Sequence, residues 1–115
     1  MDGSKVREEL ITILGNNVKF NKRFDEFVSK LKEGMAGDLI DWCKRCKENK
    51  ELGSVPPRKE FKNLYVFFRK IASDVRAVLI KEQNKEFIEL ILDNHGYYDD
   101  ARAKLGYKKS SHYGS

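Results

Sequence analysis

The second half of the chain constrains the fold most. Between residues 64 and 93, three runs rich in β-branched and aromatic residues alternate with very short polar turns. These runs are residues 64 to 70, 75 to 83 and 87 to 93. Connections of about 2–5 residues join antiparallel neighbours, because a parallel crossover needs about a dozen residues. The pattern therefore predicts an antiparallel sheet. The third run is apolar on both of its faces, which places it at the centre of the sheet or under cover on both sides.

The N-terminal segment predicts one helix and one strand. Val6, Leu10 and Leu14 recur at helical spacing, which indicates a short amphipathic helix over residues 4 to 14. Polar and apolar side chains then alternate over residues 17 to 21, which is typical of a short strand. The sheet is therefore expected to have four strands.

Two further helices are expected before the strand-rich half. Residues 22 to 33 and about 38 to 50 carry apolar side chains at helical spacing, and Gly34 and Gly37 are expected to interrupt the helical region between them. Helices joined by so short a turn form a hairpin, and a helical hairpin can pack on one face of a sheet.

The remaining segments complete an α+β domain. The Gly, Ser and Pro-Pro content of residues 51 to 63 indicates a loop. A short C-terminal helix is expected over residues 97 to 106, ending at Gly106. The predicted fold is α+β: a small antiparallel four-stranded sheet with a helical hairpin packed on it, an extra N-terminal helix and a short C-terminal helix. A single domain is expected over residues 1–107, followed by a disordered tail over residues 108–115.

Charge and segment composition narrow the functional classes. The chain carries 23 Lys and Arg against 18 Asp and Glu, a net charge of +5. Basic residues outnumber acidic ones over residues 58 to 81, which favours a polyanion on one surface, although an ordinary solvated strand face carries similar charges. The N-terminus lacks the apolar core of a secretory signal, and no run approaches the ~18 apolar residues of a membrane span. The expected location is the cytoplasm.

The two cysteines do not predict a metal or redox site. Cys43 and Cys46 form a C-x-x-C motif, but no second pair accompanies it and no His is near. The motif falls inside a predicted helix, whereas a redox C-x-x-C begins one. We expect two small core residues and no metal. The sequence also contains no phosphate-binding P-loop and no dinucleotide fingerprint, so no cofactor is expected.

Two arginines are the first candidate catalytic residues. Arg69 and Arg76 flank the tight turn between the first two strands of the C-terminal half. A guanidinium held on a rigid strand suits bidentate contact with phosphate and stabilises charge at a reacting phosphorus. We expect both arginines on one concave, positively charged face near His95. The alternative is cross-strand pairing with Glu82 or Asp74.

His95, Tyr97 and Tyr98 follow the last strand directly. A histidine can serve as acid or base in RNA cleavage, and a tyrosine can stack on a base or donate a proton. The alternative is a turn with a surface histidine and a tyrosine that packs the final helix. The candidate RNA-binding residues are the pair Lys62–Asn63, Lys70, Lys81 and Tyr97.

Over residues 17 to 107 the chain resembles the RelE/ParE superfamily of toxins from toxin–antitoxin systems. The resemblance lies in an early strand (NVKFNKRF), a helical hairpin, and strands reading LYVFFRK and SDVRAVLI. The ending from Ile91 to His95, with Tyr98 and the helix that follows, is similar to the family's H-x-x-Y-D ending. Phe67 stands where the family often has an acid, and Val75 stands where it often has a tyrosine.

The resemblance implies an mRNA endonuclease that acts on the ribosome and is neutralised by an antitoxin protein. The RNA 2′-hydroxyl would attack the adjacent phosphorus without a metal. Arg69 and Arg76 would hold the phosphate, His95 would be the acid/base group, and Tyr98 would stack or transfer a proton. Phe67 removes a candidate general base, which favours two alternatives: a gyrase-targeting toxin of the related branch, or a non-catalytic nucleic-acid-binding module of the same fold.

Overall fold

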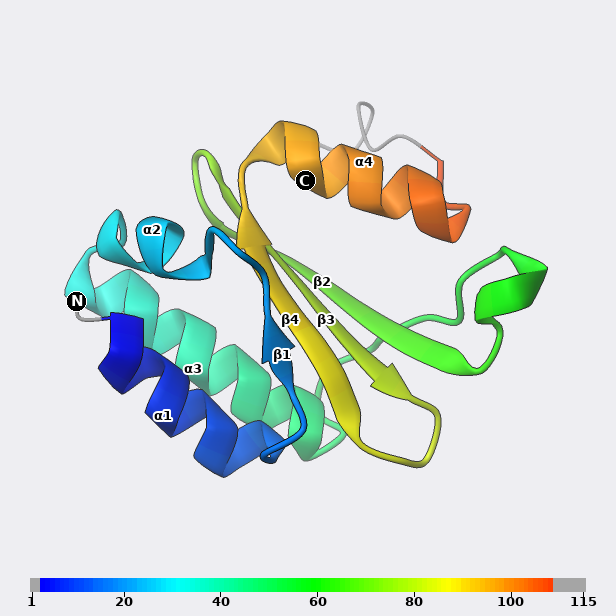
Figure 1. Ribbon diagram of the computed structural model, residues 1–115, viewed down its shortest axis with the longest axis horizontal. Coiled ribbons are helices and arrows are strands. Elements are labelled where there is room, and N and C mark those ends of the chain that lie inside the picture. Colours follow the sequence, from blue (N-terminus) through cyan, green and yellow to red (C-terminus); the bar gives the residue numbers. More distant parts are fainter. Residues whose placement is uncertain (1–2, 109–115) are drawn as a thin grey trace.

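The computed structural model describes residues 3–108 and has the expected α+β architecture (Figure 1). Of the expected disordered tail, all but Lys108 lies outside the described residues. The elements in chain order are α1 (Gly3–Leu14), β1 (Lys19–Phe20), α2 (Phe24–Ser29), α3 (Glu33–Lys47), a 3₁₀ turn (Lys59–Phe61), β2 (Leu64–Ala72), β3 (Val75–Glu82), β4 (Phe87–Asp93) and α4 (His95–Leu105).

The four strands form one mixed sheet in the order β1-β4-β3-β2. β2, β3 and β4 are antiparallel neighbours, and β4 is central, as predicted. The sheet is thus mainly antiparallel, as expected, and β1 is the exception because it runs parallel to β4. Residues 21–86, which include α2, α3, β2 and β3, supply the long connection that parallel pairing needs. The Asn21 side chain extends the pairing, because it donates to the Leu92 carbonyl (3.1 Å) and accepts from the Leu92 amide (2.9 Å).

Helices cover both faces of the sheet (Figure 1). On one face, called the α3 face here, α1, α2 and α3 bury a large core against strand residues such as Phe67, Leu79 and Leu90. On the other, called the α4 face, Tyr98 and Leu105 pack against Val66, Val78 and Ile91. Successive residues of a strand point to opposite faces, so β2, β3 and β4 each contribute to both cores.

The helix boundaries differ from the prediction around Gly34 and Gly37. α3 begins at Glu33 and contains both glycines, whereas α2 ends at Ser29. A glycine inside a helix costs about 1 kcal/mol relative to alanine. Ala36, Leu39 and Ile40 are all buried from this first part of α3, and their packing outweighs that cost.

The C-terminal helix begins two residues earlier than predicted. The Asn94 side chain caps it by accepting from the Tyr97 amide at 2.9 Å, so His95 is the first helical residue rather than part of a turn. Gly106 ends the helix in the left-handed conformation, as expected. None of the helices in the described part of the chain has the length and apolar content needed to span a bilayer.

Candidate functional site

Arg76 lies at the end of the sheet where α4 begins, on the α4 face. Its side chain is only 5% exposed, and its Nη1 donates to the carbonyls of Ala72 (2.9 Å) and Ser73 (3.1 Å). Within residues 3–108 its buried Nε has no hydrogen-bond partner. The guanidinium therefore stabilises the β2–β3 turn through these two hydrogen bonds. It also places a positive charge at this end of the sheet.

Arg69 does not share that face. It pairs in register with Ala77, which belongs to the core of the α3 face, and its Nη1 lies 3.8 Å from the Glu51 carboxylate. A β-bulge at Ile71 causes this, since Lys70 pairs with Arg76 while Ala72 pairs with Val75. A shift of one residue turns every side chain of a strand to the opposite face. The expected face shared by Arg69 and Arg76 is not formed.

The same bulge brings Lys70 beside Arg76. The two residues are direct cross-strand partners on the α4 face, and Lys70 is exposed. Arg76 faces Asp93 on its other side, and the buried Asp93 carboxylate lies 3.4 Å from Nη1 of Arg23. Lys70, Arg76 and Asp93 thus form one row across the end of the sheet, with its exposed cation at the β2 side.

His95 stands at the same end of the molecule. Its amide donates to the Asp74 carboxylate at 3.4 Å, so it rests on the turn that Arg76 also holds. Its imidazole is 47% exposed, and Nε2 lies 3.3 Å from the carboxylate of Asp99, one helical turn further along α4. An accessible imidazole oriented by a carboxylate is a usual arrangement for an acid/base group.

The two tyrosines after His95 have different surroundings. Tyr98 is 2% exposed and packs edge-on against Phe68 at a centroid distance of 5.7 Å. It belongs to the core, which is the alternative considered for it above. Tyr97 is 45% exposed and free to meet a ligand. Phe67 is buried on the α3 face, so an acid at this position would face away from the site on the α4 face.

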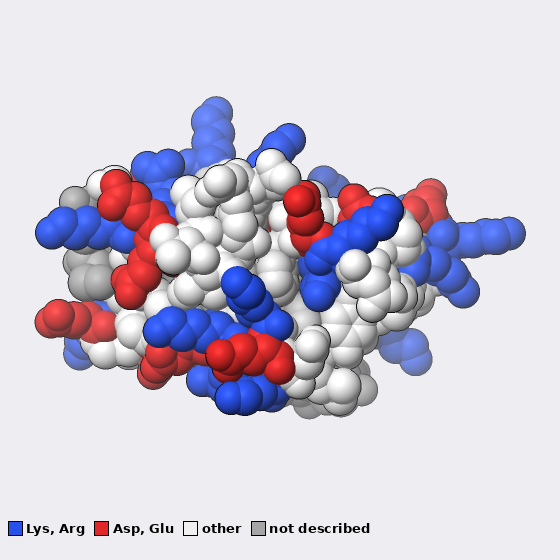
Figure 2. Space-filling model, turned by 90° about the horizontal axis from the view of Figure 1, so that it is seen from below, with Lys and Arg blue, Asp and Glu red and all other residues white. Residues whose placement is uncertain are grey.

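The other candidate RNA-binding residues lie apart from this cluster. Lys62 and Asn63 are exposed just before β2, whereas Lys70 lies near the other end of β2, beside Arg76 of β3. The amino group of Lys81 lies 5.1 Å from the centroid of the Phe87 ring, which belongs to the core of the α3 face. Figure 2 shows the side where α1 lies, and there Lys and Arg are interspersed with Asp and Glu rather than gathered into one basic patch.

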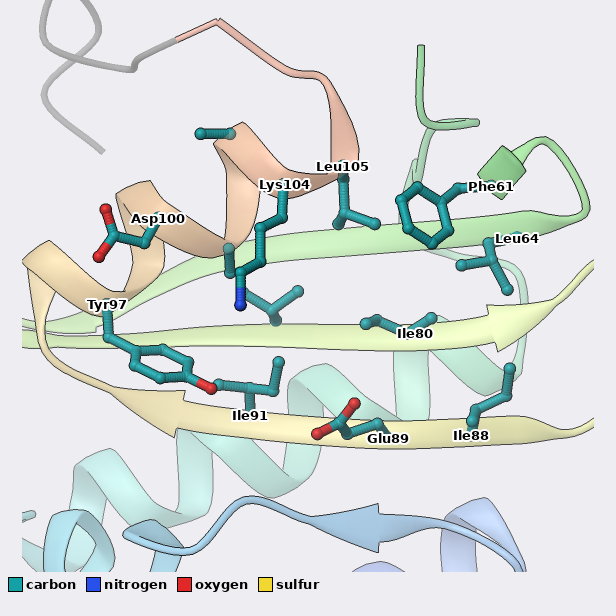
Figure 3. Close-up of a pocket in the computed structure, with 13 residues that line it drawn as sticks. Phe61, Leu64, Ile80, Ile88, Glu89, Ile91, Tyr97, Asp100, Lys104 and Leu105 are labelled. Carbon is teal, nitrogen blue, oxygen red and sulfur yellow. The ribbon is translucent and has the colours of Figure 1, made fainter. Parts of the chain in front are cut away.

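The α4 face carries a groove that the sequence did not predict. It has a volume of about 650 Å³ and lies between α4 and the strands β3 and β4 (Figure 3). Its floor is aliphatic, and Glu89, Asp100 and Lys104 bring charges to it. The alternation of β4 gives no sign of this groove, because a second bulge creates its floor: Ile80 pairs with Glu89 and Lys81 with Phe87, which leaves Ile88 as an extra residue.

Cys43 and Cys46 are fully buried core residues, as expected. Burial raises the pKa of the Cys43 thiol far above its usual range. Burial, together with the nearby Glu51 carboxylate, raises the pKa of Cys46 to about 12. Both thiols are therefore neutral and unreactive at physiological pH. Within residues 3–108, no group of three or more His, Cys, Asp or Glu side chains is placed to hold a metal ion.

Comparison with known proteins returned no family model, no curated protein and no solved structure that matches the chain.

Proposed function

We propose that this protein is a toxin-like endoribonuclease that cleaves mRNA on the ribosome without a metal and so inhibits translation. The observation that carries the proposal is that Arg76 and His95 both rest on the β2–β3 turn, with Lys70 beside Arg76. Cleavage by an RNA 2′-hydroxyl requires charge stabilisation at phosphorus and a proton acceptor or donor. This end of the α4 face offers both.

The roles differ from those expected at the outset. Lys70, which is exposed, contacts the scissile phosphate, and the buried Arg76 adds positive charge behind it. His95, oriented by Asp99, is the acid/base group, and the exposed Tyr97 takes the stacking role that the buried Tyr98 cannot fill. Arg69 has no part in the site, because it lies on the opposite face with Glu51.

The test is cleavage of mRNA in a purified translation system, with analysis of the new RNA ends. A 2′-hydroxyl attack leaves a cyclic phosphate or a 3′-phosphate, and this end distinguishes it from hydrolysis that leaves a 3′-hydroxyl. His95→Gln is expected to slow cleavage by about a hundredfold or more. Lys70→Gln, which loses a charge-assisted contact, is expected to slow it by about tenfold.

Arg69→Gln is the matched control, since it removes the same charge from the neighbouring position on the other face of the sheet. Its cleavage rate is expected to equal that of the unaltered protein. Equal losses in Lys70→Gln and Arg69→Gln would contradict the proposed site.

One observation favours the second candidate function, a gyrase-targeting toxin or a non-catalytic nucleic-acid-binding module. The Nη1 group of Arg76 already donates to two backbone carbonyls, and the residue is only 5% exposed. Such an arginine can be wholly structural. Growth arrest with intact mRNA that is unchanged in a Lys70→Gln, His95→Gln double variant would establish the gyrase-targeting toxin. Tight RNA binding without cleavage would establish the nucleic-acid-binding module.

A further inference from the structure

The groove on the α4 face exists because α4 covers only part of the sheet. The helix packs towards β2 through Tyr98 and Arg102, which both contact Phe68. Two of the helix residues that line the groove, Ala101 and Ala103, have small side chains. Space of about 650 Å³ is left above β3 and β4. This volume falls within the roughly 300–1,000 Å³ range of small-molecule sites.

The floor of the groove is an aliphatic track. Ile80 and Ile91 alternate onto this face from β3 and β4, and the bulge adds Ile88 to them. Phe61 and Leu105 line the end of the groove that is away from Tyr97 (Figure 3). An unbranched hydrocarbon chain suits such a track, because it removes apolar surface from water along its whole length.

The same bulge places a carboxylate in the track. Glu89 is adjacent to Ile88 and lines the groove from the same side of β4. It is partly buried, and within residues 3–108 it forms no salt bridge. Burial raises its pKa, which the neighbouring Lys19 partly offsets. A carboxylate in this position is stabilised most by a cation whose attached hydrocarbon chain also covers the apolar floor of the groove.

We propose that the groove binds an aliphatic amine, with the hydrocarbon chain on the aliphatic track and the ammonium group at Glu89. Of the two carboxylates that line the groove, that of Glu89 lies over the strands, whereas that of Asp100 is turned away from the groove (Figure 3). Lys19 is the cross-strand neighbour of Glu89 on β1. Lys104 is exposed and extends from α4 over the groove, whereas Glu89 is partly buried at the strands (Figure 3). The Glu89 carboxylate is therefore the charge at the floor of the groove. The proposal does not rest on the proposed RNA cleavage, although Tyr97 lines this groove as well.

The test compares three probes of equal chain length by isothermal titration calorimetry at pH 7.5: octylamine, octanol and octanoate. Octylamine is expected to bind about tenfold more tightly than octanol, as one charge-assisted hydrogen bond allows. Octanoate is expected to bind more weakly than octanol because Glu89 repels it. Tightest binding by octanoate, or no binding by any of the three probes, would overturn the proposal.

Variants identify the group responsible. Glu89→Gln keeps the shape of the side chain and is expected to remove the preference for octylamine while octanol binds as before. Lys104→Gln is the matched control on the opposite wall, and the preference for octylamine should persist or increase in it. Ala101→Leu fills the groove and should weaken both octylamine and octanol. A preference that survives Glu89→Gln would refute the role of this carboxylate. An apolar peptide that displaces octylamine from the groove and itself binds equally well in Glu89→Gln would refute an amine as the occupant.

Discussion

Arg69 and Arg76 come from neighbouring strands but leave the sheet on opposite faces. Arg69 stands opposite Ala77 and reaches Glu51, whereas Arg76 stands opposite Lys70 and reaches the turn carbonyls. One arginine is thus a partly exposed member of an ion pair, and the other is a buried support of the backbone. The two should therefore differ in what they contribute to stability.

We expect Arg76→Ala to lower the free energy of unfolding by about 1–3 kcal/mol, because it leaves the Ala72 and Ser73 carbonyls without their donor. Arg69→Ala should cost no more than about 1 kcal/mol, since its ion pair is long and solvent-screened. Urea denaturation of both variants measures the difference. A loss in Arg76→Ala no larger than that in Arg69→Ala would show that the turn does not depend on the Arg76 guanidinium.

The Glu89 carboxyl should make stability depend on pH. Burial raises its pKa in the folded protein above the ordinary 4.5 of the unfolded chain. The protonated form is therefore favoured by folding, and this contribution is complete below the unfolded value and is lost as the pH rises through the folded value. Glu89→Gln, which is neutral at every pH, should be more stable than the unaltered protein at pH 7, with the difference shrinking towards pH 3.

Denaturant titrations of both proteins across this range provide the measurement. Asp99→Asn, whose carboxylate faces His95 rather than the groove, is a suitable control. A stability difference for Glu89→Gln that grows as the pH falls would mean that ionised Glu89 stabilises the fold.

The two glycines of the C-terminal helix should respond oppositely to alanine. Gly106 has a φ of 97°, and an added Cβ would lie 2.9 Å from the Arg58 backbone nitrogen. Gly106→Ala is therefore expected to destabilise the protein by about 1–2 kcal/mol or more. Gly96 is helical and has room for a methyl group, so Gly96→Ala should be neutral or stabilising by up to about 1 kcal/mol. Thermal unfolding of the pair tests this, and destabilisation of equal size in both would be inconsistent with it.

Periodicity predicted the elements better than their junctions. The period-two runs gave β2, β3 and β4 with their order, and helical spacing gave α1 almost to the residue. The start of α3 was missed because local glycine propensity is weaker than the burial of Ala36 and Leu39. Such burial is a tertiary effect that a window of sequence does not contain.

The candidate site was harder to predict because two bulges decide it. Without the bulge at Ile71, Arg69 would stand opposite Val78 and share a face with Arg76, as was expected. Without the bulge at Ile88, β4 would lay a simple alternating surface under α4. A bulge depends on the register between two paired strands, so the sequence of one strand alone does not predict it. The position of His95 at this end of the sheet could be predicted because it directly follows a strand, and a position at a strand end needs no register.

The pairing of β1 with β4 also sets the order in which the chain can assemble. Lys19 and Phe20 meet Glu89 and Leu90, so some seventy residues must be synthesised between the two partners. Until β4 has emerged from the ribosome, β1 has nothing to pair with and β3 presents an open edge. Contacts so distant in sequence form late. The last strand to be synthesised, β4, is thus the one that joins β1 to β3. A chain that ends before residue 87 would lack this strand, and the exposed strand edges would make it prone to aggregation.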